Sequence, residues 1–181
     1  MSKRILLAAG GTGGHMFPAQ ALAEILKDQG WDVALMTDRR GLKHVENIPA
    51  SEHIEVEAAS ISPKHPIRAV GGAIKLWRGI RTAKKFMRRW RPDIVVGFGG
   101  YPSFPALSVA KSFHIPSVLH EQNAVLGRVN RVFASQADWV VSGFDMLVNL
   151  PKGANWVALG NPLREAVRKA STRTYAAPED T

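Results

Sequence analysis

The chain has 181 residues and no cysteine, which excludes a disulfide framework and a thiolate metal site. Hydrophobic residues make up 45% and charged residues 22%, the composition of a globular domain, and no apolar run approaches the ~18 residues that a transmembrane helix needs. The short apolar run after Lys3 and Arg4 lacks a small-residue cleavage pattern, so we expect no signal peptide and a cytoplasmic domain.

The net charge of +9 comes from one part of the chain. Residues 64–91 contain ten of the 24 Lys and Arg residues and no acidic residue, so this segment alone accounts for the excess of positive charge. A single basic segment in an otherwise neutral protein predicts one anionic partner surface.

The first predicted strand, 4–9, leads into a glycine-rich turn and a helix over 17–29. The stretch "AAGGTGGHMFPA" contains Gly10, Gly11, Gly13 and Gly14, more than a turn requiring positive φ would need. Bare backbone between a strand and a helix favours a phosphate or diphosphate site, because amide groups and the helix N-terminus both face the anion. His15 closes this turn and is a candidate general base, or a donor to a substrate oxygen.

Two further strands are expected at 32–37 and 54–57. Asp38, Arg39 and Arg40 follow the first of these, as in an NADP-binding site. The dinucleotide fingerprint itself fails, since Met16 stands where its third glycine would be, and no P-loop lysine follows the glycine turn. An NADP-dependent reductase therefore remains a distant alternative.

A long helix within 68–90 carries most of the basic segment. A helical wheel places Leu76, Trp77, Ile80, Ala83, Phe86, Met87 and Trp90 on one half. The other half holds Lys75, Arg78, Arg81, Lys84, Lys85, Arg88 and Arg89. We expect the apolar half to pack on the sheet and the cationic half to face an anionic membrane surface rather than nucleic acid, because an aromatic stacking strip and a second basic segment are absent.

The second half of the chain repeats the pattern of a strand followed by a polar or glycine-rich cluster. Strands are predicted at 93–97, 116–120, 138–142 and 156–158, and helices at 104–113 and 125–134. The clusters are Gly97-Phe98-Gly99-Gly100-Tyr101, His120-Glu121-Gln122-Asn123 and Gly160-Asn161-Pro162-Leu163-Arg164. Gly99 and Gly100 expose backbone for a second anion or a sugar, and the polar side chains suit a ligand rich in hydroxyl groups.

Strands that alternate with helices predict an α/β fold, a Rossmann-like doubly wound parallel sheet of about seven strands. The clusters would then gather at the carboxyl edge of the sheet, where such folds bind ligands. Adjacent His120 and Glu121 point apart, so we expect no metal site there. Residues 171–181 lose periodicity and are expected to fray or to begin a linker.

In order and spacing, these clusters resemble the N-terminal half of the MurG family, the bacterial N-acetylglucosaminyltransferases of peptidoglycan synthesis. The matching residues run from 4 to about 168 and include Pro18 and Asn130 besides the clusters quoted above. The resemblance implies the N-terminal domain of a GT-B type glycosyltransferase over residues 1–164, with 165–181 as a linker or tail. The C-terminal donor-binding domain would be absent, so the isolated chain would be inactive.

The resemblance also implies a reaction and partners. N-acetylglucosamine would move from UDP-N-acetylglucosamine to the 4-hydroxyl of the muramoyl group of lipid I, giving lipid II with inversion and without a cofactor or a metal. The enzyme would lie peripherally on the inner face of the cell membrane, through a patch formed here by Lys75, Trp77, Arg78, Ile80, Arg81, Lys84, Lys85, Arg88 and Arg89. A non-catalytic module that binds a lipid diphosphate is the nearer alternative, because half of a transferase can act as a binding protein.

Site residues carry over by matching positions. His15 is the candidate base and Glu121 the alternative base. The donor side would comprise Thr12, Gly13, Gly14, Asn123 and Arg164, and the acceptor and diphosphate side Gly99, Gly100, Tyr101, His120 and Asn130.

Overall fold

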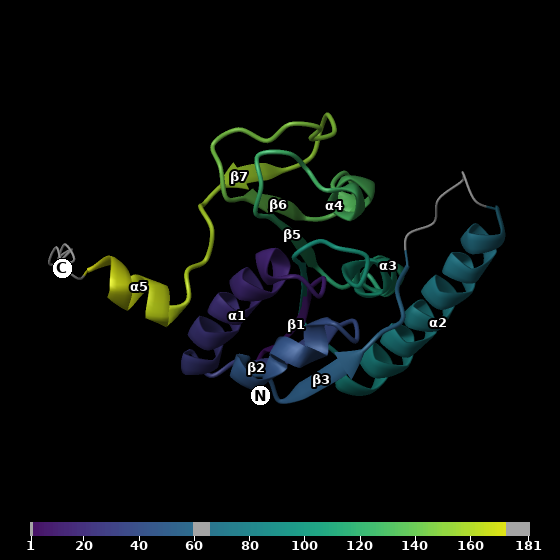
Figure 1. Ribbon diagram of the computed structural model, residues 1–181, viewed down its shortest axis with the longest axis horizontal. Coiled ribbons are helices and arrows are strands. Elements are labelled where there is room, and N and C mark those ends of the chain that lie inside the picture. The colour runs from purple at the N-terminus through teal and green to yellow at the C-terminus, as the bar shows by residue number, and fades with distance from the viewer. Residues whose placement is uncertain (1, 60–65, 173–181) are drawn as a thin grey trace, which may run out of the picture.

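The computed structural model describes residues 2–59 and 66–172, and its centre is one parallel sheet of seven strands (Figure 1). The strands are β1 Arg4–Ala8, β2 Asp32–Thr37, β3 Glu52–Glu55, β4 Ile94–Gly97, β5 Ser117–Glu121, β6 Trp139–Ser142 and β7 Trp156–Ala158. Their order, β3-β2-β1-β4-β5-β6-β7, reverses direction between β1 and β4. This confirms the predicted doubly wound α/β fold and puts the ligand crevice expected of such folds at the carboxyl ends of β1 and β4.

Helices cover both faces of the sheet (Figure 1). They are α1 Gly13–Asp28, the 3₁₀ helix η1 Gly41–Asn47, α2 Pro66–Trp90, α3 Ser103–Ser112, α4 Arg128–Phe133 and α5 Glu165–Ser171. One buried cluster joins α1 to alternate residues of β1 and β2, such as Leu7 and Leu35, and the other joins α2, α3 and α4 to the opposite side, such as Leu6 and Met36. Alternation along the strands therefore builds two cores, one on each face of the sheet.

Helix α1 begins at Gly13, one turn before the predicted start at residue 17. The helical pattern in the sequence begins near Phe17, because the glycines before it give no periodic signal. In the structure Pro18 lies inside the helix, and the glycines with His15 form its first turn. The glycine-rich stretch is thus part turn and part helix N-terminus.

Other boundaries differ from the predictions near the edges of the sheet. Strand β3 lies at 52–55 rather than 54–57, because Ala34 to Thr37 of β2 pair with Glu52 to Glu55. Helix α4 begins at 128 rather than 125, because Val125 forms an isolated bridge with Val148 instead. The short helices η1 and α5 were not predicted.

Helix α2 buries Ala83, Phe86, Met87 and Trp90, as its periodicity predicts. The helical wheel predicted that Trp77 would pack on the sheet, and this was wrong because Trp77 is 59% exposed. Ile80, on the same half of the wheel, is only partly buried. Val70, Ile74 and Trp77 form an exposed apolar ridge that continues along the same side of the helix as Arg81 and Arg88. Among the described residues, no helix has the length and apolar character needed to cross a membrane.

The part of the chain after β7 makes few contacts with the sheet. Helix α5 buries no residue and projects away from the rest of the domain (Figure 1). Its described link to α1 is a long hydrogen bond of 3.4 Å from the Glu165 amide to the Glu24 carboxylate. Most of the predicted tail, residues 173–181, lies outside the described residues, as does Lys64 of the basic segment.

Candidate functional site

The loops after β1 and β4 touch at the point where the strand order reverses. The Gly10 amide donates to the Gly99 carbonyl at 3.0 Å. A Cβ added to Gly100 would lie only 2.8 Å from the Gly10 Cα, and Gly99 and Gly100 both have positive φ. The glycines therefore allow two backbone segments to meet at a distance that side chains would prevent.

The N-terminus of α1 opens onto this junction. Thr12 is the N-cap residue, yet its side chain makes no capping hydrogen bond. Its hydroxyl lies 2.8 Å from Nδ1 of His15 instead. The Gly14 amide thus lacks the partner that a capping hydroxyl would supply, and the Gly13 amide also has no hydrogen bond to a described residue, which is the arrangement suited to binding an anion.

The His15 ring lies against the glycine loop of β4. A Cβ at Gly99 would be 3.3 Å from Nε2 of His15 and 3.3 Å from Nδ2 of Asn130, so both side chains border the same small space. Burial lowers the pKa of His15, and the charge of Glu121 partly opposes this shift. A lowered pKa keeps the imidazole neutral near pH 7, which a proton acceptor requires.

Glu121 organises the loop between β5 and α4. Its Oε1 accepts from the backbone amide and Nδ2 of Asn123, at 3.2 and 3.1 Å, and its Oε2 accepts from the Gly127 amide at 2.8 Å and Asn130 Nδ2 at 3.0 Å. The side chain is buried, with the residue 2% exposed. Both oxygens are occupied by protein donors, so this geometry favours His15 over Glu121 as the base.

Asn130 contributes an unpaired acceptor to the same region. Its Nδ2 also donates to the His120 carbonyl at 3.2 Å, whereas its buried Oδ1 has no partner among the described residues. An unsatisfied buried acceptor costs about 1–3 kcal/mol. The site therefore has a place for one more hydrogen-bond donor, such as a hydroxyl group.

His120 lies on the face of the sheet that α1 covers, against Phe98, whereas Glu121 points to the opposite face. Its Nδ1 accepts from the Gln122 side chain at 3.0 Å, and its Nε2 donates to the Gly160 carbonyl at 3.3 Å. Burial lowers the pKa of His120, although the Gly160 hydrogen bond and the Glu121 charge oppose the shift. Both ring nitrogens have protein partners, so His120 links β5 to the segment after β7.

Arg164 reaches back to the N-terminus of α1. Its guanidinium lies 3.9 Å from the centre of the Phe17 ring, a cation–π contact. A hollow of about 320 Å³ between them is lined by Gly13, Gly14, Phe17, Pro18, Gln122, residues 161–164 and Val167. Sequence reasoning missed Phe17; its place one turn after Gly13 and Gly14, on the exposed side of the helix, is the signal that could have identified it.

Tyr101 and Asn123 do not join His15 directly. Tyr101 lines a separate apolar groove of about 270 Å³ between α2, α3 and α4, in which Arg128 is the one charged residue among the described lining residues. Asn123 is exposed at the rim, where its contacts with Glu121 fix the loop. The structure therefore brings Thr12, His15, Gly99, Gly100 and Asn130 together and places Tyr101 in a neighbouring hollow.

Asp38 is not available to a cofactor ribose. Its Oδ1 accepts from the Gly41 amide at 3.0 Å, and its Oδ2 binds Arg40 at 2.9 Å. A Cβ at Gly11 would lie 2.1 Å from Oδ1, so the carboxylate is packed tightly under the glycine turn. This geometry removes the feature on which the reductase alternative depended.

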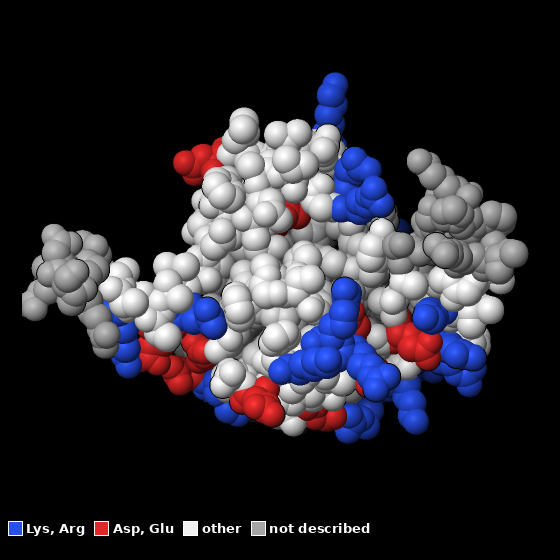
Figure 2. Space-filling model, viewed as in Figure 1, with Lys and Arg blue, Asp and Glu red and all other residues white. Residues whose placement is uncertain are grey.

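The exposed side of α2 gathers Lys and Arg side chains (Figure 2). Arg78 pairs with Glu57 at 3.8 Å and Arg89 pairs with Glu52. Arg81, Lys84, Lys85 and Arg88 have no ion pair with any described residue. We call these four residues the basic face.

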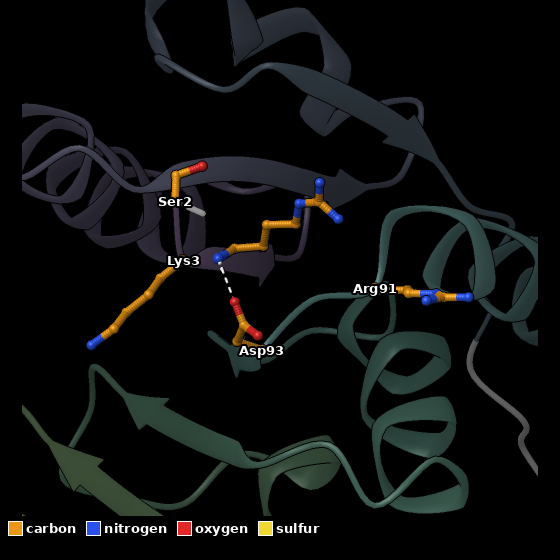
Figure 3. Close-up of a pocket in the computed structure, with 5 residues that line it drawn as sticks. Ser2, Lys3, Arg91 and Asp93 are labelled. Atoms are coloured by element: carbon orange, nitrogen blue, oxygen red, sulfur yellow. Dashed lines mark hydrogen bonds between the residues drawn. The ribbon is translucent and has the colours of Figure 1, made fainter.

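A larger hollow of about 760 Å³ lies at the amino ends of β1 and β4, opposite the glycine turns. Ser2, Lys3, Arg4, Arg91 and Asp93 line it (Figure 3). Lys3 and Arg91 point in opposite directions, and Asp93 accepts from the Arg4 amide at 2.7 Å. Its charged groups do not converge, so its size does not make it a binding site.

Residues 5–142 match the glycosyltransferase family 28 N-terminal domain. The chain is 51% identical over 177 residues to a protein of Maricaulis maris named UDP-N-acetylglucosamine--N-acetylmuramyl-(pentapeptide) pyrophosphoryl-undecaprenol N-acetylglucosamine transferase, covering 97% of this chain and 48% of that protein. A protein of Rhizobium meliloti with the same name is 48% identical, covering 95% and 46%.

Solved structures agree with these matches. The crystal structure of Acinetobacter baumannii MurG superposes with a TM-score of 0.72 at 26% identity, over 97% of this chain and 50% of that one. The spinosyn forosaminyltransferase SpnP, at 12% identity and a TM-score of 0.62, shares the fold. The chain spans about half the length of the curated relatives it matches.

Proposed function

Because the chain belongs to glycosyltransferase family 28, whose N-terminal domain it contains, we propose that it is the acceptor-facing half of an N-acetylglucosaminyltransferase of peptidoglycan synthesis. The donor would be UDP-N-acetylglucosamine and the acceptor lipid I, as the names of its relatives suggest. The observation that carries the proposal is the meeting of His15, the glycine loops and the uncapped start of α1 at one point of the sheet edge.

The proposed reaction is a single displacement at the anomeric carbon of the donor sugar. The acceptor 4-hydroxyl gives its proton to His15 as its oxygen attacks that carbon, and the bond to the diphosphate breaks, so UDP leaves and the configuration inverts. The unpaired Oδ1 of Asn130 would orient a substrate hydroxyl beside His15. We keep Glu121 as the alternative base, although its four hydrogen bonds favour a role in holding the loop.

The negatively charged groups of the substrates would bind at two places in the site. The amides of Gly13 and Gly14 suit a phosphate or a sugar oxygen, and Arg164 suits the diphosphate of the donor. Gly99 and Gly100 would border the acceptor, with Tyr101 and the apolar groove beside them. Asn123 would contact the donor sugar from the rim, and His120 would support the loop through its contact with Gln122, on the face of the sheet that α1 covers.

A lipid-linked acceptor requires the enzyme to work at a membrane surface. The exposed ridge of Val70, Ile74 and Trp77 and the basic face occupy successive parts of the same side of α2. Apolar side chains followed by unpaired cations favour peripheral binding to anionic lipid on the cytoplasmic leaflet. We therefore place the protein on the inner face of the cell membrane.

The domain boundary is part of the proposal. Residues 1–164 would form the N-terminal domain, and 165–181 would begin the connection to a C-terminal domain that holds most of the UDP-sugar pocket. The exposed surface of α5 and the length of the relatives support this division.

A joined enzyme tests the proposal: residues 1–164 of this chain followed by the C-terminal half of the Maricaulis maris relative. We expect it to transfer radiolabelled N-acetylglucosamine from UDP-N-acetylglucosamine to a lipid I analogue. Binding of the analogue without transfer would favour the lipid-diphosphate binding module. Binding of NADPH would favour the alternative of an NADP-dependent reductase.

A further inference from the structure

His15 is held by the protein through one ring nitrogen. Nδ1 lies 2.8 Å from the Thr12 hydroxyl, whereas Nε2 has no hydrogen bond to any described residue. Nε2 borders the space next to Gly99 and Asn130, where the proposed function places the acceptor hydroxyl. The two nitrogens therefore have different environments.

The contact to Nδ1 replaces the usual role of Thr12. A threonine at an N-cap normally accepts from an amide in the first helical turn, which stabilises a protein by about 1 kcal/mol. Thr12 has the extended backbone of an N-cap, with φ −117° and ψ 151°, but makes no such bond. Helix stability does not explain why its hydroxyl faces the imidazole.

We propose that Thr12 is a positioning residue that holds neutral His15 with its proton on Nδ1, so that the Nε2 lone pair faces the acceptor hydroxyl. In this tautomer the Nδ1–H donates to the Thr12 oxygen. The inference rests on the proposed function for its catalytic meaning, because there His15 takes the proton of the acceptor hydroxyl, and the inference assigns that proton to Nε2.

The position of each proton before and after the transfer favours a hydrogen bond in which Nδ1–H of His15 donates to the Thr12 oxygen. When Nε2 takes the proton of the acceptor hydroxyl, the ring becomes an imidazolium that carries N–H groups at both positions. A hydroxyl that donated to Nδ1 would require the ring proton on Nε2, and Nε2 could then not accept the proton of the acceptor hydroxyl. A hydroxyl that accepts from Nδ1 keeps the same bond before and after the transfer, so the ring stays oriented throughout.

The domain contains the opposite tautomer as an internal reference. The Gln122 amide can only donate to Nδ1 of His120, and the Gly160 carbonyl can only accept from Nε2. Neutral His120 must therefore carry its proton on Nε2. His15 and His120 should therefore show opposite neutral tautomers in the same protein sample.

Nuclear magnetic resonance of the 181-residue chain tests the inference directly. Two-bond ¹H–¹⁵N correlation spectra of histidine-labelled protein at about pH 8 distinguish the two neutral tautomers. We expect His15 as the Nδ1–H form and His120 as the Nε2–H form, with assignments from His15→Gln and His120→Gln. Thr12→Val should remove the single-tautomer signature of His15, whereas Thr12→Ser, which keeps the hydroxyl, should retain it.

An Nε2–H tautomer of His15 in the unsubstituted chain would overturn the inference without any variant, and so would an unchanged His15 signature in Thr12→Val. An unchanged His120 signal shows that a variant is folded. The proposed function fails on a different result, namely a joined enzyme whose kcat is insensitive to His15→Ala. Either conclusion can therefore fall while the other stands.

Discussion

At the scale of single residues, the partly buried imidazole of His15 and the buried imidazole of His120 should make the stability of the domain depend on pH. Burial lowers the pKa of both His15 and His120. Below about pH 6.5 the unfolded chain takes up protons that the folded chain does not, so the free energy of unfolding rises with pH in this range. This stability is present above the unfolded pKa and is lost as pH falls through the lowered folded values.

Urea unfolding at pH 5.5 and pH 7.5 measures the effect. We expect a higher free energy of unfolding at the higher pH, and a smaller difference in the double variant His15→Gln, His120→Gln. His53→Gln is the matched control, because His53 is exposed. Equal pH dependence in the double variant and the control would contradict the assignment.

Glu121→Gln should destabilise the domain, because the new NH₂ group would face donors such as the Gly127 amide. We expect a loss of about 1–3 kcal/mol in the free energy of unfolding, the cost of leaving a buried donor unpaired. Glu46→Gln, at an exposed position, provides the control for the same chemical change. A Glu121→Gln chain of normal stability that loses kcat in the joined enzyme would instead support Glu121 as the base.

At the scale of elements, α2 predicts membrane binding that depends on salt. Lys84→Ser, Lys85→Ser and Arg88→Ser together remove three unpaired cations from the basic face. Each contributes about 1 kcal/mol near an anionic surface, so the affinity for phosphatidylserine vesicles should fall on the order of a hundredfold at low salt. Sedimentation with vesicles measures it.

The control removes three exposed lysines elsewhere, with Lys27→Ser, Lys43→Ser and Lys152→Ser. It changes the net charge equally and should weaken adsorption far less. Equal losses for the two triple variants would mean that only net charge matters, and no loss in either would leave the basic face as a solvated surface. Trp77→Ser should reduce the part of adsorption that persists at high salt, where charges are screened.

The elements themselves were largely predictable from the sequence, because strand runs and helical periodicity depend on local pattern. The start of α1 at Gly13 was not predictable, since glycine is a poor helix former and the helical pattern begins only near Phe17. The exposure of Trp77 was not predictable either, because a helical wheel orders side chains by angle alone and does not show which part of the apolar half meets the core: Trp77 is exposed although Leu76 and Ile80 beside it are partly buried.

At the scale of the whole molecule, the clusters after β1, β4 and β5 could be placed at one edge from strand order alone. Strand order alone could not predict which side chains of these clusters come into contact. Alternation along β5 predicts that His120 and Glu121 point apart, but their contacts with Phe98 and Asn130 and the return of Arg164 to Phe17 depend on tertiary packing.

The 181-residue chain is expected to fold alone and to transfer no sugar, because two buried clusters close both faces of its sheet while the relatives extend to about twice its length. A single cooperative urea transition, together with no labelled product from UDP-N-acetylglucosamine and a lipid I analogue, would agree with this. Turnover by the purified chain would show that the domain holds a complete active site.

The central claim is that His15 takes the proton of the acceptor hydroxyl, and the most direct test is kcat of the joined enzyme with His15 and with His15→Ala. We expect the substitution to lower kcat by roughly 10²–10⁴-fold, the range for removing a general base, with the fold unchanged by circular dichroism. A near-normal kcat accompanied only by a raised KM would contradict the claim and make His15 a substrate-binding residue.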